Sequence, residues 1–143
     1  MLIILTYNKN QNKMYEAIVN AVKTKVLTND RIEMVIPNGT AVQNARTSFV
    51  GDTLTRDGYH LSLDLGRYIA ALTLISKLTG NDLSDLAFMP NGLNEHKKEV
   101  AIESALNAIL KPYEVTKSSN SAPRAIEWNV TTYQNQIITN TKY

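Results

Sequence analysis

The sequence has no cysteine and only two histidines, and both scarcities narrow the chemistry available to the chain. Without thiols there is no disulfide framework, no thiolate zinc site and no cysteine nucleophile, so a covalent nucleophile would have to be Ser or Thr. His60 and His96 are far apart and stand among dispersed carboxylates, which gives no metal-ligand spacing. A glycine-rich phosphate loop is also missing. We therefore expect no metal and no cofactor.

Long apolar runs and charge clusters are missing too. The N-terminal run from Leu2 to Leu5 is short, follows no basic residue and precedes no small-residue cleavage site, so it predicts neither a signal peptide nor a membrane span. Fifteen basic and thirteen acidic residues are scattered along the chain and leave a net charge of +2, which favours no nucleic-acid surface. We expect a soluble chain without nucleic-acid partners, and its cellular location is left open.

What remains is the composition of a globular domain, with 43% apolar and 20% charged residues. Residues 2–7 and 32–36 are short, apolar and β-branched, which is typical of buried strands. Apolar residues recur three and four apart over residues 11–27, which predicts a helix between them. Strand, helix and strand in this length suit a βαβ unit, so the pattern predicts an α/β fold with parallel strands.

The middle of the chain is predicted to be mainly helical. A short helix is expected over residues 40–46, followed by a loop over residues 47–60. Ser62 can cap a helix that ends at Gly80, and Asn94 can cap one over residues 95–110 that Pro112 stops. The organisation expected is a domain over residues 1–116, a Ser- and Asn-rich linker over 117–124, and a β-rich tail over 125–143 that suits a hairpin.

Asp57 and His60 form the clearest candidate for chemistry. They are three residues apart across Gly58, just before a helix. A carboxylate at this spacing can accept the Nδ1 proton of the imidazole and leave Nε2 facing a substrate, which is the arrangement of a general base with its orienting group. Such a quartet also occurs by chance, and the alternative is a solvated loop histidine.

Asn44 and Arg46 are the candidate substrate-binding residues, because the turn after residue 36 lies at the expected ligand edge of the sheet. Arg46 suits an anionic or hydroxyl-rich ligand, but bracing of the loop through Asp52 or Asp57 is an equal alternative. Aromatic side chains around Tyr113 and at Trp128 could stack on sugar or serve packing.

A longer resemblance includes these residues. Three strings carry it: residues 35–48 (VIPNGTAVQNARTS), residues 51–62 (GDTLTRDGYHLS) and residues 66–71 (GRYIAA). Together they resemble a bacterial domain family of unknown function in the SGNH (GDSL-like) hydrolase superfamily. The similarity extends over about residues 5–118 and corresponds to the C-terminal portion of such a domain.

This resemblance implies a partial three-layer α/β/α fold of flavodoxin-like type with few parallel strands. It also implies ester hydrolysis by Ser, His and Asp, in which Asp57 orients His60 and His60 acts first as base and then as acid. In that superfamily the nucleophilic serine follows the first strand, and glycine and asparagine blocks come after it. None of these blocks is present here. Ser48 and Ser62 are near His60 in sequence, but neither stands in a strand-to-helix elbow.

Two functions follow as expectations. The first is the Asp-x-x-His half of an acyl or carbohydrate esterase, inactive as an isolated chain and completed by an N-terminal half that supplies the serine. The second is a non-catalytic structural, assembly or binding module derived from the same fold. With either function, the partial sheet would have exposed edge strands. The expected partners are therefore another copy of the chain or a complementing N-terminal half.

Overall fold

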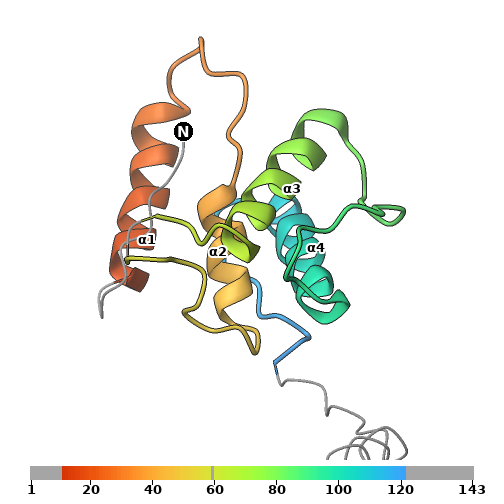
Figure 1. The fold of residues 1–143 in the computed structure, drawn as a ribbon. Helices are drawn as coiled ribbons and strands as arrows, with labels where there is room; N and C mark the ends of the chain where they lie inside the picture. Colours follow the sequence, from red (N-terminus) through yellow and green to blue (C-terminus); the bar gives the residue numbers. More distant parts are fainter. Residues whose placement is uncertain (1–10, 59, 122–143) are drawn as a thin grey trace, which may run out of the picture.

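The structure, a computed structural model, describes residues 11–58 and 60–121, and the regular elements of this part of the chain are all helices. Figure 1 shows them along the chain. They are α1 (Gln11–Ala21), its π-helical continuation η1 (Val22–Val26), α2 (Asn38–Arg46), α3 (Leu65–Thr79) and α4 (Glu95–Leu110).

Helices α2, α3 and α4 pack against one another and hold the hydrophobic core. Helix α1 stands to one side of this group, beyond α2 (Figure 1). A hydrogen bond of 3.0 Å between the hydroxyl groups of Tyr15 and Thr40 connects α1 to α2. The three-helix core therefore sets the positions of the loops between α2 and α3 and after α4.

The core follows the apolar spacing of the helices. Each of the three helices contributes one buried stripe, and the loops add four apolar side chains. The buried members are Ala41, Val42 and Ala45 from α2, Leu65, Tyr68, Ile69 and Leu72 from α3, Val100, Ala101, Ala105 and Ala108 from α4, and Val50, Leu54, Leu83 and Leu93 from loops. Alanine predominates on the inner face of α4, so the other two helices can approach it closely.

Three predicted helix ends are confirmed, at Asn94, Gly80 and Leu110, whereas the N-cap residue of α3 is Asp64 and not the predicted Ser62. The side chain of Asn94 accepts a hydrogen bond of 2.9 Å from the backbone N–H of Lys97 and so caps α4. Gly80 ends α3 with φ of +74°, a left-handed conformation that glycine adopts without strain. Helix α4 ends at Leu110, just before Pro112.

The predicted α/β, flavodoxin-like fold is wrong for the described residues. They contain no strand and no sheet, and a single isolated bridge joins Thr55 to Leu61. An SGNH-type three-layer architecture is therefore not what this part of the chain forms. The prediction rested on residues 32–36, which have strand-like composition, and on residues 2–7, which lie outside the described residues, as does the tail 125–143.

The physical reason for the difference is that the described residues offer residues 32–36 no strand to pair with. Residues 32–36 run between η1 and α2 without helical structure, and no backbone hydrogen bond joins residues 33–35 to any other described segment. Strand propensity reflects packing and pairing with neighbours, so a β-branched segment alone is not a sheet.

None of the described helices is both long and apolar enough to cross a membrane.

A candidate acid–base site and its surroundings

Asp57 and His60 lie in direct contact. One carboxylate oxygen of Asp57 is 2.6 Å from Nδ1 of His60, and the other accepts a hydrogen bond of 2.7 Å from the backbone N–H of the same histidine. The carboxylate thus holds both the ring and the backbone of His60. Gly58 permits this tight turn because its φ is +82°, which side chains disfavour.

A short closed loop supports the Asp57–His60 pair. The backbone N–H of Arg56 donates to the carbonyl of His60 at 3.0 Å, and that of Ser62 donates to the carbonyl of Leu54 at 2.9 Å. The side chain of Leu54 is 1% exposed and anchors one arm of the loop in the core. The loop is therefore attached at its base while the pair stands at its outer end.

Both side chains of the pair face solvent. The side chains of His60 and Asp57 are 59% and 48% exposed. When His60 is neutral, its contact with the carboxylate places the ring proton on Nδ1, so Nε2 carries a lone pair. No described residue makes a hydrogen bond to Nε2. This is the donor–acceptor geometry of a general base that is oriented by a carboxylate.

The two serines discussed as neighbours of His60 in the sequence, Ser48 and Ser62, make hydrogen bonds to other groups in the structure. The hydroxyl of Ser48, a buried residue, donates to the carbonyl of Ala45 at 2.7 Å. The hydroxyl oxygen of Ser62 accepts from the backbone N–H of Gly66 at 2.8 Å. A hydrogen bond between Ser62 and the carboxylate of Asp64 is the main cause that lowers the pKa of Asp64. Neither hydroxyl is paired with His60.

Asn44 lies inside the protein. It is 1% exposed, its Nδ2 donates to the carbonyl of Ser104 at 3.2 Å, and its Oδ1 accepts from the backbone N–H of Thr116 at 2.7 Å. The side chain thereby joins α2 to α4 and to the segment that follows α4. The structure uses this amide for internal hydrogen bonds, and Asn44 does not meet the Asp57–His60 pair through any of them.

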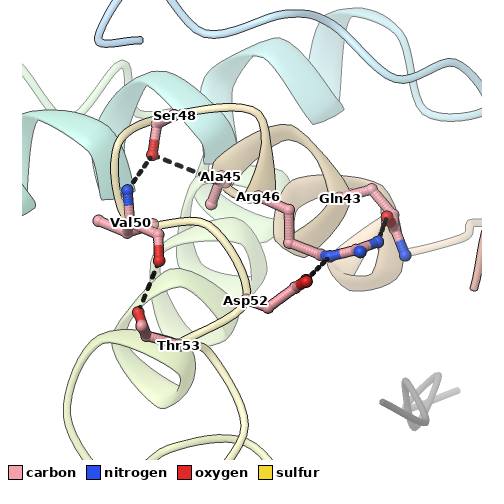
Figure 2. Close-up of polar contacts among 7 residues, drawn as sticks. All are labelled: Gln43, Ala45, Arg46, Ser48, Val50, Asp52 and Thr53. Atoms are coloured by element: carbon pink, nitrogen blue, oxygen red, sulfur yellow. Dashed lines mark hydrogen bonds and ion pairs between the residues drawn. The ribbon is translucent and has the colours of Figure 1, made fainter. Parts of the chain in front are cut away.

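Arg46 braces the turn after α2, as Figure 2 shows. Its Nε is 2.5 Å from the carboxylate of Asp52, and its NH1 group donates to Oε1 of Gln43 at 2.6 Å. Of the two alternatives open for Arg46 in the sequence, the structure shows loop bracing, through Asp52. The side chain is still 22% exposed and lines a pocket.

That pocket was not predicted from the sequence. It has a volume of about 550 Å³ and is lined by residues of α1, of α2 and of the segment after α4: Tyr15, Glu16, Gln43, Arg46, Thr47, Tyr113, Glu114 and Val115. Burial raises the pKa of Tyr15, the hydrogen bond with Thr40 opposes this, and the charge of Glu114 adds to the rise. The sequence indicated Arg46 and Tyr113 separately as candidate ligand-binding residues. Only the tertiary structure shows that they line the same pocket.

The remaining histidine is engaged elsewhere. The ring of His96 stacks on that of Phe49, with centroids 4.3 Å apart and an interplanar angle of 30°. No group of acidic and histidine side chains among the described residues has the arrangement of a metal site. His60 is thus the histidine that the structure leaves accessible beside a carboxylate.

Comparisons with known proteins name a family without an activity. Residues 3–108 match the model of a domain of unknown function, DUF4886. The structure is similar to the crystal structure of a DUF4886 family protein from Bacteroides uniformis, with 46% identity and a TM-score of 0.75 over 81% of this chain and 44% of that chain. This chain therefore spans less than half of that protein. No curated protein matches. The chain belongs to the DUF4886 family.

Proposed function

We propose that the chain carries the base-and-orienter half of an ester-hydrolase site of SGNH type, with His60 as general base and Asp57 as its orienting group. The acyl or carbohydrate ester is the substrate class. This proposal does not depend on a flavodoxin-like sheet. Its main support is the 2.6 Å contact between the carboxylate of Asp57 and Nδ1 of His60.

The geometry suits this chemistry in three respects. The carboxylate is bound to the backbone of His60 as well as to its ring, so the imidazole is held in one orientation. The exposed Nε2 can take a proton from a hydroxyl nucleophile and return it to the leaving group. The loop is attached to the core through Leu54, which limits movement of the pair.

The nucleophile must come from outside the described residues. Ser48 and Ser62 are committed to other hydrogen bonds, and without a nucleophile the pair cannot form an acyl-enzyme. The Bacteroides uniformis relative is more than twice as long as the matched region. We assign the serine to the part of the Bacteroides uniformis chain that this chain does not match.

The proposal is tested with a chimera in which this chain replaces the matching region of the Bacteroides uniformis protein. Hydrolysis of an activated acetyl ester is measured for the chimera and for its His60→Ala, Asp57→Asn and His96→Ala variants. Loss of the base or of the orienting carboxylate should lower kcat by about 10³–10⁴-fold. His96→Ala is the matched control, because it removes the other histidine of the chain, and it should retain activity.

The isolated chain provides the second comparison. Wild type and His60→Ala should hydrolyse the same ester at equal background rates, because the proposal places the nucleophile in the part of the relative that this chain does not match. The proposed function would be contradicted if the chimera folds but shows no ester hydrolysis, or if its hydrolysis is unchanged by His60→Ala.

An assembly module is the second candidate, and residues 32–36 favour it. Ile32 and Met34 in this segment are 39% and 47% exposed, and the backbone of residues 33–35 makes no hydrogen bonds to other described segments. Such a segment can pair with a strand of another chain. Under this alternative, changes at Asp57 and His60 would leave the function intact while changes at Ile32 and Met34 would impair it.

A further inference from the structure

The pocket between α1, α2 and the segment after α4 is separate from the proposed acid–base site, because neither Asp57 nor His60 lines it. Its volume of about 550 Å³ lies within the range of roughly 300–1,000 Å³ that is usual for small-molecule sites. Two tyrosine rings, Tyr15 and Tyr113, contribute aromatic surface, and Gln43 and Arg46 contribute polar groups.

Gln43 supplies the sharpest indication that the pocket accepts a ligand. The residue is 3% exposed and lines the pocket, yet its Nε2 group has no hydrogen-bond partner among the described residues. Its Oε1 is already occupied by the NH1 group of Arg46 at 2.6 Å, which fixes the orientation of the amide. A buried donor without a partner is unfavourable, so a ligand oxygen that accepts a hydrogen bond from Gln43 would stabilise the complex.

The charges around the pocket select against a free anion. Arg46 is the cation that lines it, and the carboxylate of Asp52, 2.5 Å away, compensates its charge. The carboxylates of Glu16 and Glu114 also line the pocket and are exposed, and no basic residue other than Arg46 is among the described lining residues. The ammonium group of Lys23, which does not line the pocket, lies over one face of the Tyr113 ring, 5.1 Å from its centre. Carboxylates can accept hydrogen bonds from hydroxyl groups but repel negatively charged ligands.

Aromatic faces, a free amide donor and carboxylate acceptors together match the chemistry of a sugar ring. The C–H face of a pyranose packs on tyrosine rings, its oxygens accept from an amide, and its hydroxyls donate to carboxylates. We propose that this pocket is a binding site for a neutral carbohydrate, in which Gln43 donates to a ring or hydroxyl oxygen and Tyr113 packs against the sugar face. The site stands independently of the proposed ester hydrolysis.

Saturation-transfer difference NMR on the full chain tests the site with two probes, methyl α-glucopyranoside and the methyl glycoside of N-acetylglucosamine. Acetate and inorganic phosphate serve as anionic counter-probes. Gln43→Glu keeps the acceptor for Arg46 but removes the free amide donor, and Tyr113→Ala removes aromatic surface at a half-exposed position. Each change should weaken glycoside binding by about tenfold, the loss expected for one hydrogen bond or one packed ring.

Asn20→Asp is the matched control, because it makes the same amide-to-carboxylate change at an exposed position of α1 that does not line the pocket. It should bind glycosides as the wild type does. The inference is overturned if neither glycoside binds the wild type, or if both pocket variants bind as tightly as the control. Binding of acetate or phosphate in place of the glycosides overturns the assignment of a neutral sugar. If Gln43→Glu does not fold, the comparison of Tyr113→Ala with the control decides the outcome.

Discussion

Single polar side chains hold the segment after α4 against the helices. Besides Asn44, the carboxylate of Glu103 on α4 accepts hydrogen bonds from the hydroxyl of Ser118 at 2.5 Å, the backbone N–H of Ser119 at 2.7 Å and the amide of Asn120 at 3.0 Å. This start of the predicted linker is therefore docked on α4, while the division into a domain, linker and tail remains a prediction.

Glu103 should contribute stability in a pH-dependent way. Its burial alone would raise the pKa, but the hydrogen bonds from Ser118, Ser119 and Asn120 outweigh burial and hold the pKa below the ordinary value of 4.5. A pKa that is lower in the folded state gives stability that is present above the unfolded value and is lost as the pH falls through the folded value. Glu103→Gln should therefore lower the free energy of unfolding at pH 7 by about 1 kcal/mol, after allowance for solvent screening.

Thermal unfolding of wild type and Glu103→Gln between pH 7 and pH 3 checks this expectation. The difference between the two proteins should be full at neutral pH and should shrink as the pH falls below the ordinary pKa of 4.5, because the carboxyl protonates in the unfolded chain first and in the folded protein at lower pH. A difference that is independent of pH would show that the charge of Glu103 is not what holds the segment.

At the scale of elements, the first turn of α3 lies directly against the loop that carries Asp57 and His60. Gly66 lies there against the carbonyl oxygen of Leu54, with the hydroxyl of Ser62 and the Cβ of Leu61 nearby. A Cβ added at Gly66 would overlap the Leu54 carbonyl, which is backbone and cannot turn aside. The helix can approach the loop only because this residue has no side chain.

Gly66→Ala should destabilise the protein by about 2–3 kcal/mol, because the overlap outweighs the roughly 1 kcal/mol by which Ala normally favours a helix over Gly. Chemical denaturation measures the change, and Gly51→Ala is the comparison. At Gly51 nothing lies within 4 Å of the added Cβ, and the cost arises only from φ of +53°. A Gly66→Ala protein more stable than wild type would mean that this contact is loose.

At the scale of the whole molecule, the described residues form a helical core beside residues 32–36, a non-helical segment in which residues 33–35 make no backbone hydrogen bond to another described segment. Ile32 and Met34 of residues 32–36 are exposed, and the segment connects η1 to α2 along the outside of the core (Figure 1). An unpaired, apolar, extended segment is the usual template for pairing between chains, and charged residues there prevent it.

Met34→Lys should therefore reduce self-association of the chain, or its association with a complementing half, while changing the free energy of unfolding by less than about 0.5 kcal/mol. Sedimentation over a range of concentrations measures the oligomeric state. Leu78→Lys is the matched control, because Leu78 is 59% exposed but lies on α3. If Leu78→Lys disrupts association and Met34→Lys does not, the contact lies on α3 rather than on residues 32–36.

Local sequence determined the helices and the contact between Asp57 and His60. The apolar spacing of α1 and α3, the Asn94 cap and the Gly80 end depend on neighbours within a few residues, and Asp57 and His60 meet across one glycine turn. Their predictions needed no knowledge of distant contacts. The family resemblance likewise identified a domain of unknown function, and the match to DUF4886 confirms that part.

Tertiary structure alone decided the rest. Whether residues 32–36 become a strand depends on a partner strand, and the described part of the chain offers none. The burial of Asn44 depends on Ser104 and Thr116, and the pocket at Gln43 depends on α1 and on the segment after α4. These contacts join residues far apart in sequence, so the local pattern determines which elements can form, and long-range packing determines which pair, which are buried and where a ligand can enter.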